Sequence, residues 1–403
     1  MPRGKLSGKL PASSDAQTRK SDVLGRSTCH TFMLGNQLPR PEKLMAVEFW
    51  KGGRPRASAA DSTLLNSARQ AMRAEEVGYD GCVFSDSQNR APDCYIALAM
   101  AAQATSTIKL GTSVTNSFTR HAAVTASAIL TVQAESGGRA HLGIGRGDTA
   151  LAYLGRAPDA VSVFEDYLKH VQAYLRGEEV PFAAGGTVES LDLADRPASS
   201  RIEWMPADLP KVPVSVAATG PKVIAAAARH ADRVTFAVGA DAERIRWGME
   251  VARAARAEAG LSPEIPFGAY VTLVVHDDPE EAMRMGEAQL SLFARFSVMY
   301  GTIVGPASES QRKVLHGIHD AYDIKQHGRA GSPQAASMTA EFSRTFGVFG
   351  PPSYCADRLS ELIELGIDRF IITGTELDPN NPQSTRSHER FFEEVVPALR
   401  KPI

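Results

Sequence analysis

Two glycine-bearing turns have the residue types that hold an anionic group such as a phosphate. Gly145-Arg146-Gly147-Asp148 follows the apolar run 140–144, and Thr219-Gly220-Pro221-Lys222 follows the apolar run 212–218. Glycines let the backbone approach a ligand, successive amides can form an anion-binding nest, and arginine adds a charge-assisted bond. Pro221 suits the first position of a helix, whose free amides can also hold an anion. Each turn alone could be ordinary capping, but two of them together favour a phosphate-bearing ligand.

Three further polar residues follow apolar runs and are candidates for the same site. His121 could be a proton donor or a hydrogen-bond donor to phosphate, or a helix-start residue with a satisfied ring. Asp86 could be a general base, and capping of its own turn is an equally good interpretation. The amide of Asn116 could bond to the edge of a heterocycle or to its own backbone. We take His121 and Asp86 as candidate catalytic residues and Asn116 as a candidate ligand-binding residue.

The sequence contains none of the motifs with which a protein does hard chemistry unaided. There is no HExxH or cysteine cluster for a metal, no Gly-x-Ser-x-Gly nucleophile elbow and no P-loop. No metal site is therefore predicted. We expect a phosphate-bearing cofactor to supply the chemistry, while the protein supplies binding and orientation.

Strand-like and helix-like runs alternate from Met45 onward. The strand 108–115, the helix 122–133 and the strand 140–144 form a βαβ unit, so these two strands should be parallel. The polar turns then lie at the carboxyl ends of strands, where α/β proteins bind ligands. Eight such units predict a (β/α)8 TIM barrel, and the lack of a Gly-x-Gly-x-x-Gly turn after the first strand argues against an open doubly wound sheet. The eight predicted strands are 46–50, 81–85, 108–115, 140–144, 212–218, 233–238, 267–275 and 370–373.

Three segments lie outside this repeat. The segments 178–211 and 301–349 are insertions after the fourth and seventh predicted strands, and long insertions in a barrel are usually lids or subunit contacts. The second could cover the barrel mouth, with helices expected over 310–322 and 333–343. Residues 1–44 are polar and poor in acids, so we expect a flexible arm before a barrel domain at 45–403.

Composition excludes several classes of protein. The 403 residues carry 44 basic and 46 acidic side chains and a net charge of −2, so nothing favours nucleic acid or an anionic membrane as a partner. No apolar run reaches the roughly 18 residues of a membrane-spanning helix. The 4 cysteines are scattered without a CxxC pair, which is typical of a reducing compartment, and we expect a cytoplasmic protein.

Several of these motifs together resemble a known family. LGTSVTN, TRH, VTASAIL, SGGRAHLGIGRGD and LPKVPVSVAATGPKVIAAAARHADRVTFAVGAD are similar to the bacterial luciferase-like superfamily, and most similar to its branch of methylenetetrahydromethanopterin reductase and related flavin-dependent oxidoreductases. The resemblance covers most of 45–301 and 350–373. It implies a (β/α)8 barrel that binds FMN or a deazaflavin, coenzyme F420, in its mouth. It also implies a cis peptide between Ser113 and Val114 behind the flavin ring, with Asn116 near the ring or ribityl chain. The matching positions near the ribityl phosphate are Gly147, Asp148, Thr149, Thr219, Gly220 and Pro221.

The resemblance leaves three functions open. The preferred one is an FMN-dependent monooxygenase that oxidises a small organic substrate with O2 and reduced flavin from a partner flavin reductase. The alternative is an F420-dependent reductase or dehydrogenase that transfers hydride, and the third is a non-catalytic flavin binder. Arg146 stands where the reductases often have proline, which slightly favours FMN. The family habit also implies a homodimer or higher homo-oligomer.

Overall fold

The computed structural model describes residues 47–54, 63–182, 187–205, 208–378 and 380–400. The polar arm expected at 1–44 lies outside the described residues. Among the residues that are described, no helix is both long enough and apolar enough to span a lipid bilayer.

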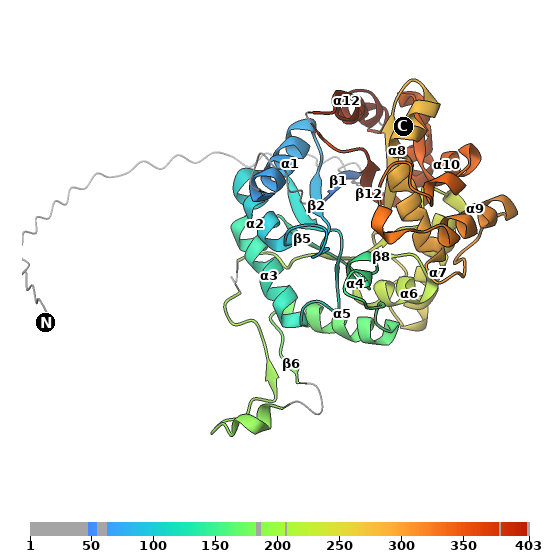
Figure 1. Cartoon of the computed structure of the whole chain (residues 1–403). Helices are drawn as coiled ribbons and strands as arrows, with labels where there is room; N and C mark the ends of the chain where they lie inside the picture. Colours follow the sequence, from blue (N-terminus) through green and yellow to red (C-terminus); the bar gives the residue numbers. More distant parts are fainter. Residues whose placement is uncertain (1–46, 55–62, 183–186, 206–207, 379, 401–403) are drawn as a thin grey trace, which may run out of the picture. The chain divides into compact units, whose positions relative to one another are not determined.

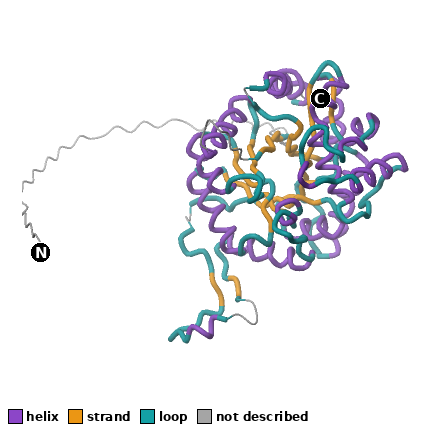
Figure 2. Tube along the Cα trace, viewed as in Figure 1, coloured by secondary structure: helices purple, strands orange, loops and turns teal. Residues whose placement is uncertain are grey.

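Eight parallel strands close into a barrel with helices around it, as predicted (Figures 1 and 2). The closure is made by the first strand, which pairs with the last through Glu48 and Arg369 and with the second through Trp50 and Gly81. The barrel strands are β1 (Glu48–Gly53), β2 (Gly81–Phe84), β3 (Lys109–Thr112) with β4 (Thr115–Asn116), β5 (Ala140–Gly145), β8 (Val214–Ala218), β9 (Arg233–Phe236), β10 (Phe267–Val275) and β12 (Ile367–Gly374).

Apolar side chains on both faces of the strands hold the barrel together. Consecutive residues of a strand point to opposite faces. Phe49 therefore joins the large cluster between strands and helices, while Trp50 joins a small cluster with Val83, Tyr270 and Ile371. All of β10 is buried, as expected of a parallel strand that is covered on both faces. The helices that cover the strands are α1 (Thr63–Val77), α2 (Cys94–Ala104), α3 (Ala122–Glu135), α5 (Val161–Leu175), α6 (Pro221–His230), α7 (Ala242–Glu258), α8 (Pro279–Arg295) and α11 (Pro352–Leu365).

The third barrel strand is split rather than continuous over 108–115. The peptide between Ser113 and Val114 is cis, as the resemblance implied, and it separates β3 from β4. The neighbouring strand has a glycine at this place: a Cβ on Gly143 would lie 2.1 Å from the carbonyl oxygen of Thr112. The close approach of the two backbones therefore requires glycine there.

The first insertion, 178–211, contains the two-stranded antiparallel sheet of β6 (Val180–Pro181) and β7 (Ser199–Ser200), which extends away from the barrel (Figure 1). The second insertion contains α9 (Glu309–Asp320), close to the helix expected there. The prediction of one helix over 333–343 is wrong. The structure has a 3-10 turn at Ala335–Ser337 and then α10 (Ala340–Phe346), which begins after its N-cap residue Thr339.

The C-terminal part contains two elements that the sequence pattern did not reveal. A short strand, β11 (Val348–Gly350), pairs with the end of β10, and α11 follows it directly. The final helical region begins at Pro382, because Asn381 accepts from the backbone N–H of Ser384 at 3.1 Å and caps α12 (Pro382–Arg390). It continues through a π-helical turn to α13 (Val396–Leu399).

Candidate functional site

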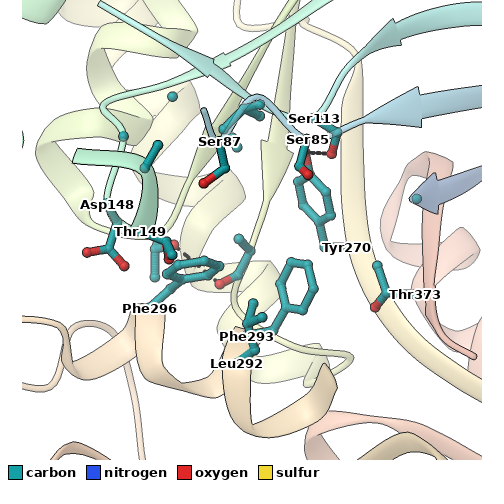
Figure 3. Close-up of a pocket in the computed structure, with 18 of the residues that line it drawn as sticks. Ser85, Ser87, Ser113, Asp148, Thr149, Tyr270, Leu292, Phe293, Phe296 and Thr373 are labelled. Carbon is teal, nitrogen blue, oxygen red and sulfur yellow. Dashed lines mark hydrogen bonds between the residues drawn. The ribbon is translucent and has the colours of Figure 1, made fainter. Parts of the chain in front are cut away.

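A cavity of about 590 Å³ opens at the carboxyl ends of the barrel strands (Figure 3). This volume lies in the range of small-molecule sites, which is roughly 300–1,000 Å³. The cavity is lined by residues that follow the strands, by the end of α8 and by part of the second insertion. Of the predicted site residues, those that line it are Asp86, Ser113, Val114, Asn116, Arg146, Gly147, Asp148, Thr149, Thr219, Gly220 and Pro221.

His121 is the one predicted site residue that does not line this cavity. It is exposed at the N-cap of α3, where its Nδ1 accepts from the backbone N–H of Ala123 at 3.2 Å. This geometry favours the capping interpretation over a catalytic one.

Asn116 has a buried side-chain amide whose oxygen is hydrogen-bonded and whose nitrogen is not, within the described ranges. Its Oδ1 accepts from the backbone N–H groups of Phe118 and Thr119 at 3.0 and 2.9 Å, which fixes the orientation of the amide. Its Nδ2 is buried and has no hydrogen-bond partner among the residues that the structure describes. A buried donor without a partner costs free energy, so a ligand that accepts from it would be stabilised. Both interpretations of Asn116 are therefore compatible with the structure.

Asp86 is buried in an ion pair rather than free. Arg120 donates to its Oδ2, and the hydroxyl of Thr115 donates to the same oxygen at 2.8 Å. Arg120 also pairs with Asp93 at 2.7 Å. Burial opposes the charge of the guanidinium, but the Asp86 carboxylate raises the pKa of Arg120 above its ordinary value. The Asp86 carboxylate is thus occupied by Arg120 and Thr115, and the geometry favours a structural role.

The turn after β5 is held by its own side chains. Arg146 donates from Nε to the carbonyl of Asp159 at 2.9 Å, and Asp148 forms an ion pair with Arg295 of α8. Gly147 has φ +79°, a conformation that favours glycine. The charge of Arg146 is directed at backbone carbonyls, which leaves it uncompensated by any carboxylate in the described part of the chain.

The turn after β8 presents bare backbone to the cavity. A Cβ on Gly220 would meet nothing within 4 Å, and Pro221 is the first residue of α6. The hydroxyl of Thr219 donates to the carbonyl of Ala237 at 3.3 Å. The open space beside Gly220 lets a ligand reach the first amides of the helix.

An aromatic wall that the sequence did not reveal closes one side of the cavity (Figure 3). Tyr270 of β10 stacks on Phe293 with ring centres 5.3 Å apart, and Phe296 meets Phe293 edge-on. The hydroxyls of Tyr270 and Ser113 share a hydrogen bond of 3.0 Å, and burial raises the pKa of Tyr270 to about 12. The helical spacing of the phenylalanines is also that of ordinary core residues, so no sequence signal distinguished them.

The second insertion contributes His327 and Gly328 to the cavity, as its expected place at the barrel mouth suggested. Arg90, which follows β2, donates to the carbonyl of His327 at 2.9 Å. No group of three or more His, Cys, Asp or Glu residues that could hold a metal occurs among the residues that the structure describes.

Comparison with known proteins places these features in a family. A family model described as luciferase-like monooxygenase matches residues 48–369. The 5,10-methylenetetrahydromethanopterin reductase of Methanolobus tindarius is 26% identical over 336 residues, which cover 80% of this chain and 94% of the reductase. Among solved structures, the coenzyme F420 dependent tetrahydromethanopterin reductase from Methanopyrus kandleri has a TM-score of 0.65 at 23% identity, covering 88% of this chain and 100% of that one. The oxygenating constituent of 3,6-diketocamphane monooxygenase from Pseudomonas putida, in complex with FMN, has a TM-score of 0.61 at 19% identity, covering 89% and 100%.

Proposed function

The chain belongs to the luciferase-like monooxygenase family, and from this premise we propose that it transfers hydride between coenzyme F420 and a small organic substrate. Membership makes it a luciferase-like oxidoreductase. The observation that supports the choice of cofactor is the match to a 5,10-methylenetetrahydromethanopterin reductase over 94% of the reductase's length. The similar solved structure from Methanopyrus kandleri is named a coenzyme F420 dependent tetrahydromethanopterin reductase. We therefore prefer the deazaflavin to the FMN that the sequence favoured.

The residues at the barrel mouth fit a flavin-like ligand. The buried Nδ2 of Asn116 and the buried hydroxyl of Ser87 have no hydrogen-bond partner in the described part of the chain. Both residues line the cavity. A heterocycle with carbonyl and ring-nitrogen acceptors would satisfy such donors. When bound, the deazaflavin supplies the hydride chemistry. Asn116 would then hold the ring or ribityl chain, and the turns at 147–149 and 219–221 would hold the phosphate.

The remaining cavity residues favour binding and water exclusion over acid–base chemistry. Asp86 and Asp148 are each paired with an arginine, so the geometry assigns both carboxylates to ion pairs. Tyr270, Phe293 and Phe296 present apolar surface to the cavity. An apolar wall excludes water from the place where hydride moves, and it orients an apolar part of the substrate.

Direct titration separates the two cofactors. The purified full chain is titrated with F420 and with FMN, and binding is followed by the fluorescence of each ligand. We expect F420 to bind at least about tenfold more tightly than FMN, which corresponds to about 1.4 kcal/mol. Tighter binding of FMN, together with consumption of O2 when reduced FMN is supplied, would favour the monooxygenase instead. A partner flavin reductase and a homo-oligomer stay predictions.

A further inference from the structure

Hydrogen bonds hold the second insertion against the turn that follows β5. The hydroxyl of Tyr153 donates to the carbonyl of Ile324 at 2.8 Å, and Arg90 donates to that hydroxyl at 3.2 Å and to the carbonyl of His327 at 2.9 Å. The Nε2 atom of His327 lies 3.5 Å from the hydroxyl oxygen of Thr149. Residues from three distant parts of the chain therefore meet at one edge of the cavity.

The ring of His327 is held in one orientation. Its Nδ1 is hydrogen-bonded to the hydroxyl of Tyr322, and burial raises the pKa of Tyr322 to about 12, so that hydroxyl keeps its proton. With the tyrosine donating to Nδ1, the imidazole carries its hydrogen on Nε2. The 3.5 Å contact with Thr149 is at the outer limit of a hydrogen bond, so this N–H has capacity left for a ligand.

Positive charge surrounds this neutral ring. Burial, together with the positive charges of Arg90, Arg295 and Arg54, lowers the pKa of His327 to about 3. Arg295 is paired with Asp148, but Arg90 interacts only with neutral oxygens and the ring of Tyr153 among the residues that the structure describes. The charge of Arg90 at this cavity edge is thus not balanced by a carboxylate, and an anion would balance it.

We propose that Arg90 and His327 form an anion subsite that the second insertion adds to the cavity, in which His327 Nε2 donates to an oxygen of a phosphate or carboxylate on the bound ligand. This inference deepens the proposed function and rests on it for the identity of the ligand. The anion has two possible sources: the acidic tail of the deazaflavin cofactor, or the substrate. Arg90 contributes charge, and His327 contributes a directed donor without a charge of its own.

The test uses three variants of the full chain. Arg90→Gln removes the charge and keeps an amide donor for Tyr153 and for the carbonyl of His327. His327→Leu removes the Nε2 donor at similar volume. His316→Leu is the matched control, because His316 is an exposed histidine of α9 in the same insertion and does not line the cavity.

Two measurements are made on each protein. The first is the affinity for F420 and for the deazaflavin chromophore that lacks the phosphate-bearing tail. The second is the shift of Tm produced by inorganic phosphate on the cofactor-free protein, which needs no cofactor at all. If His327→Leu does not fold, the same two measurements on Arg90→Gln test the proposed subsite.

We expect phosphate to raise the Tm of the wild type and of His316→Leu, and to raise that of Arg90→Gln and His327→Leu much less. If the two variants also bind F420 about tenfold more weakly while binding of the tailless chromophore changes less than about twofold, the anion belongs to the cofactor. If both deazaflavins bind the variants as they bind the wild type, the anion belongs to the substrate. Equal phosphate shifts in all four proteins overturn the subsite. Absence of any deazaflavin binding by the wild type overturns the proposed function alone.

Discussion

Gly147 lies directly against Asn116: a Cβ on the glycine would be 2.9 Å from the Cβ of the asparagine. Real Cβ atoms do not approach so closely, so the turn after β5 and the buried amide can only coexist with glycine at 147. The candidate phosphate turn and the candidate ring-binding amide are therefore one packed unit, and a change in either residue disturbs the other.

We expect Gly147→Ala to destabilise the protein more than Gly155→Ala. Both glycines have positive φ, +79° and +67°, but a Cβ on Gly155 would meet nothing within 4 Å. Gly155→Ala should therefore cost only the backbone term, about 1–2 kcal/mol, and Gly147→Ala should cost about 1–3 kcal/mol more. Urea denaturation of both variants measures the difference. Equal losses would show that position 147 relaxes freely.

Substitutions of Asn116 can distinguish its role in holding the backbone turn from its role in binding the ligand. Asn116→Ala removes both the Oδ1 acceptor and the Nδ2 donor, whereas Asn116→Asp keeps an acceptor for Phe118 and Thr119 and loses the donor. We expect both variants to bind the deazaflavin about tenfold more weakly, and only the alanine variant to lose about 1 kcal/mol of stability. The exposed Asn380 provides the control substitution Asn380→Ala. Wild-type affinity in Asn116→Asp would remove Asn116 from the site.

Asp86→Asn tests whether this carboxylate is a general base or a structural partner. It leaves the guanidinium of Arg120 with Asp93 alone, so we expect a loss of about 1–3 kcal/mol in the free energy of unfolding. The turnover of the folded enzyme should fall less than about tenfold. A fall of 10²-fold or more at unchanged stability is the outcome expected of a general base.

Stability should decrease as the pH falls from about 6.5 to 5. Burial lowers the pKa of His388 to about 3, while a histidine of the unfolded chain titrates near 6.5. The unfolded state therefore binds more protons in this window. The contribution of His388 to stability is fully present above pH 6.5 and is lost progressively as the pH falls toward the folded pKa of about 3. Each such histidine contributes a slope of up to about 1.4 kcal/mol per pH unit.

His388→Gln should remove the contribution of one proton to the slope of the free energy of unfolding against pH, about 1.4 kcal/mol per pH unit at most. The ring of His388 is hydrogen-bonded to the hydroxyl of Tyr79 at 2.7 Å and to that of Thr375 at 3.1 Å, so the variant also loses stability at every pH. The dependence of the free energy of unfolding on pH is measured separately from this loss. His170→Gln, at an exposed position of α5, controls for the loss of a histidine as such. Identical slopes in the wild type and His388→Gln would contradict the prediction.

The barrel could be predicted because its determinants are local. Alternation of apolar strands with helical runs predicts each βα unit, and the order of units along the chain places polar turns such as 145–148 at one end of the sheet. The cis bond at Ser113 was available only through the family resemblance. The ends of elements are harder to predict, as α9 illustrates by ending at Asp320 rather than at residue 322, because caps depend on single side chains.

The parts of the site that were missed depend on contacts between distant residues. Asp86 meets Arg120 only because two barrel strands are neighbours, and nothing in the sequence distinguishes that pairing from a free carboxylate. Phe293 and Phe296 have the spacing of core residues on a helix. His327 lies between the two helices predicted in the second insertion, where no local pattern marks it. Its place at the cavity edge follows from the hydrogen bonds that Arg90 and Tyr153 donate to this part of the chain.

The cavity is built from parts that differ in how freely they can change. The residues at the strand ends belong to a backbone whose hydrogen bonds close the barrel, so their positions are common to any protein that keeps the fold. His327 and its neighbours belong to the second insertion, and at the cavity edge the side chains of Arg90 and Tyr153 donate to its backbone carbonyls. A homologous segment could replace this insertion without altering a single barrel strand, so ligand preference can diverge in evolution, or be exchanged by engineering, as a separable module.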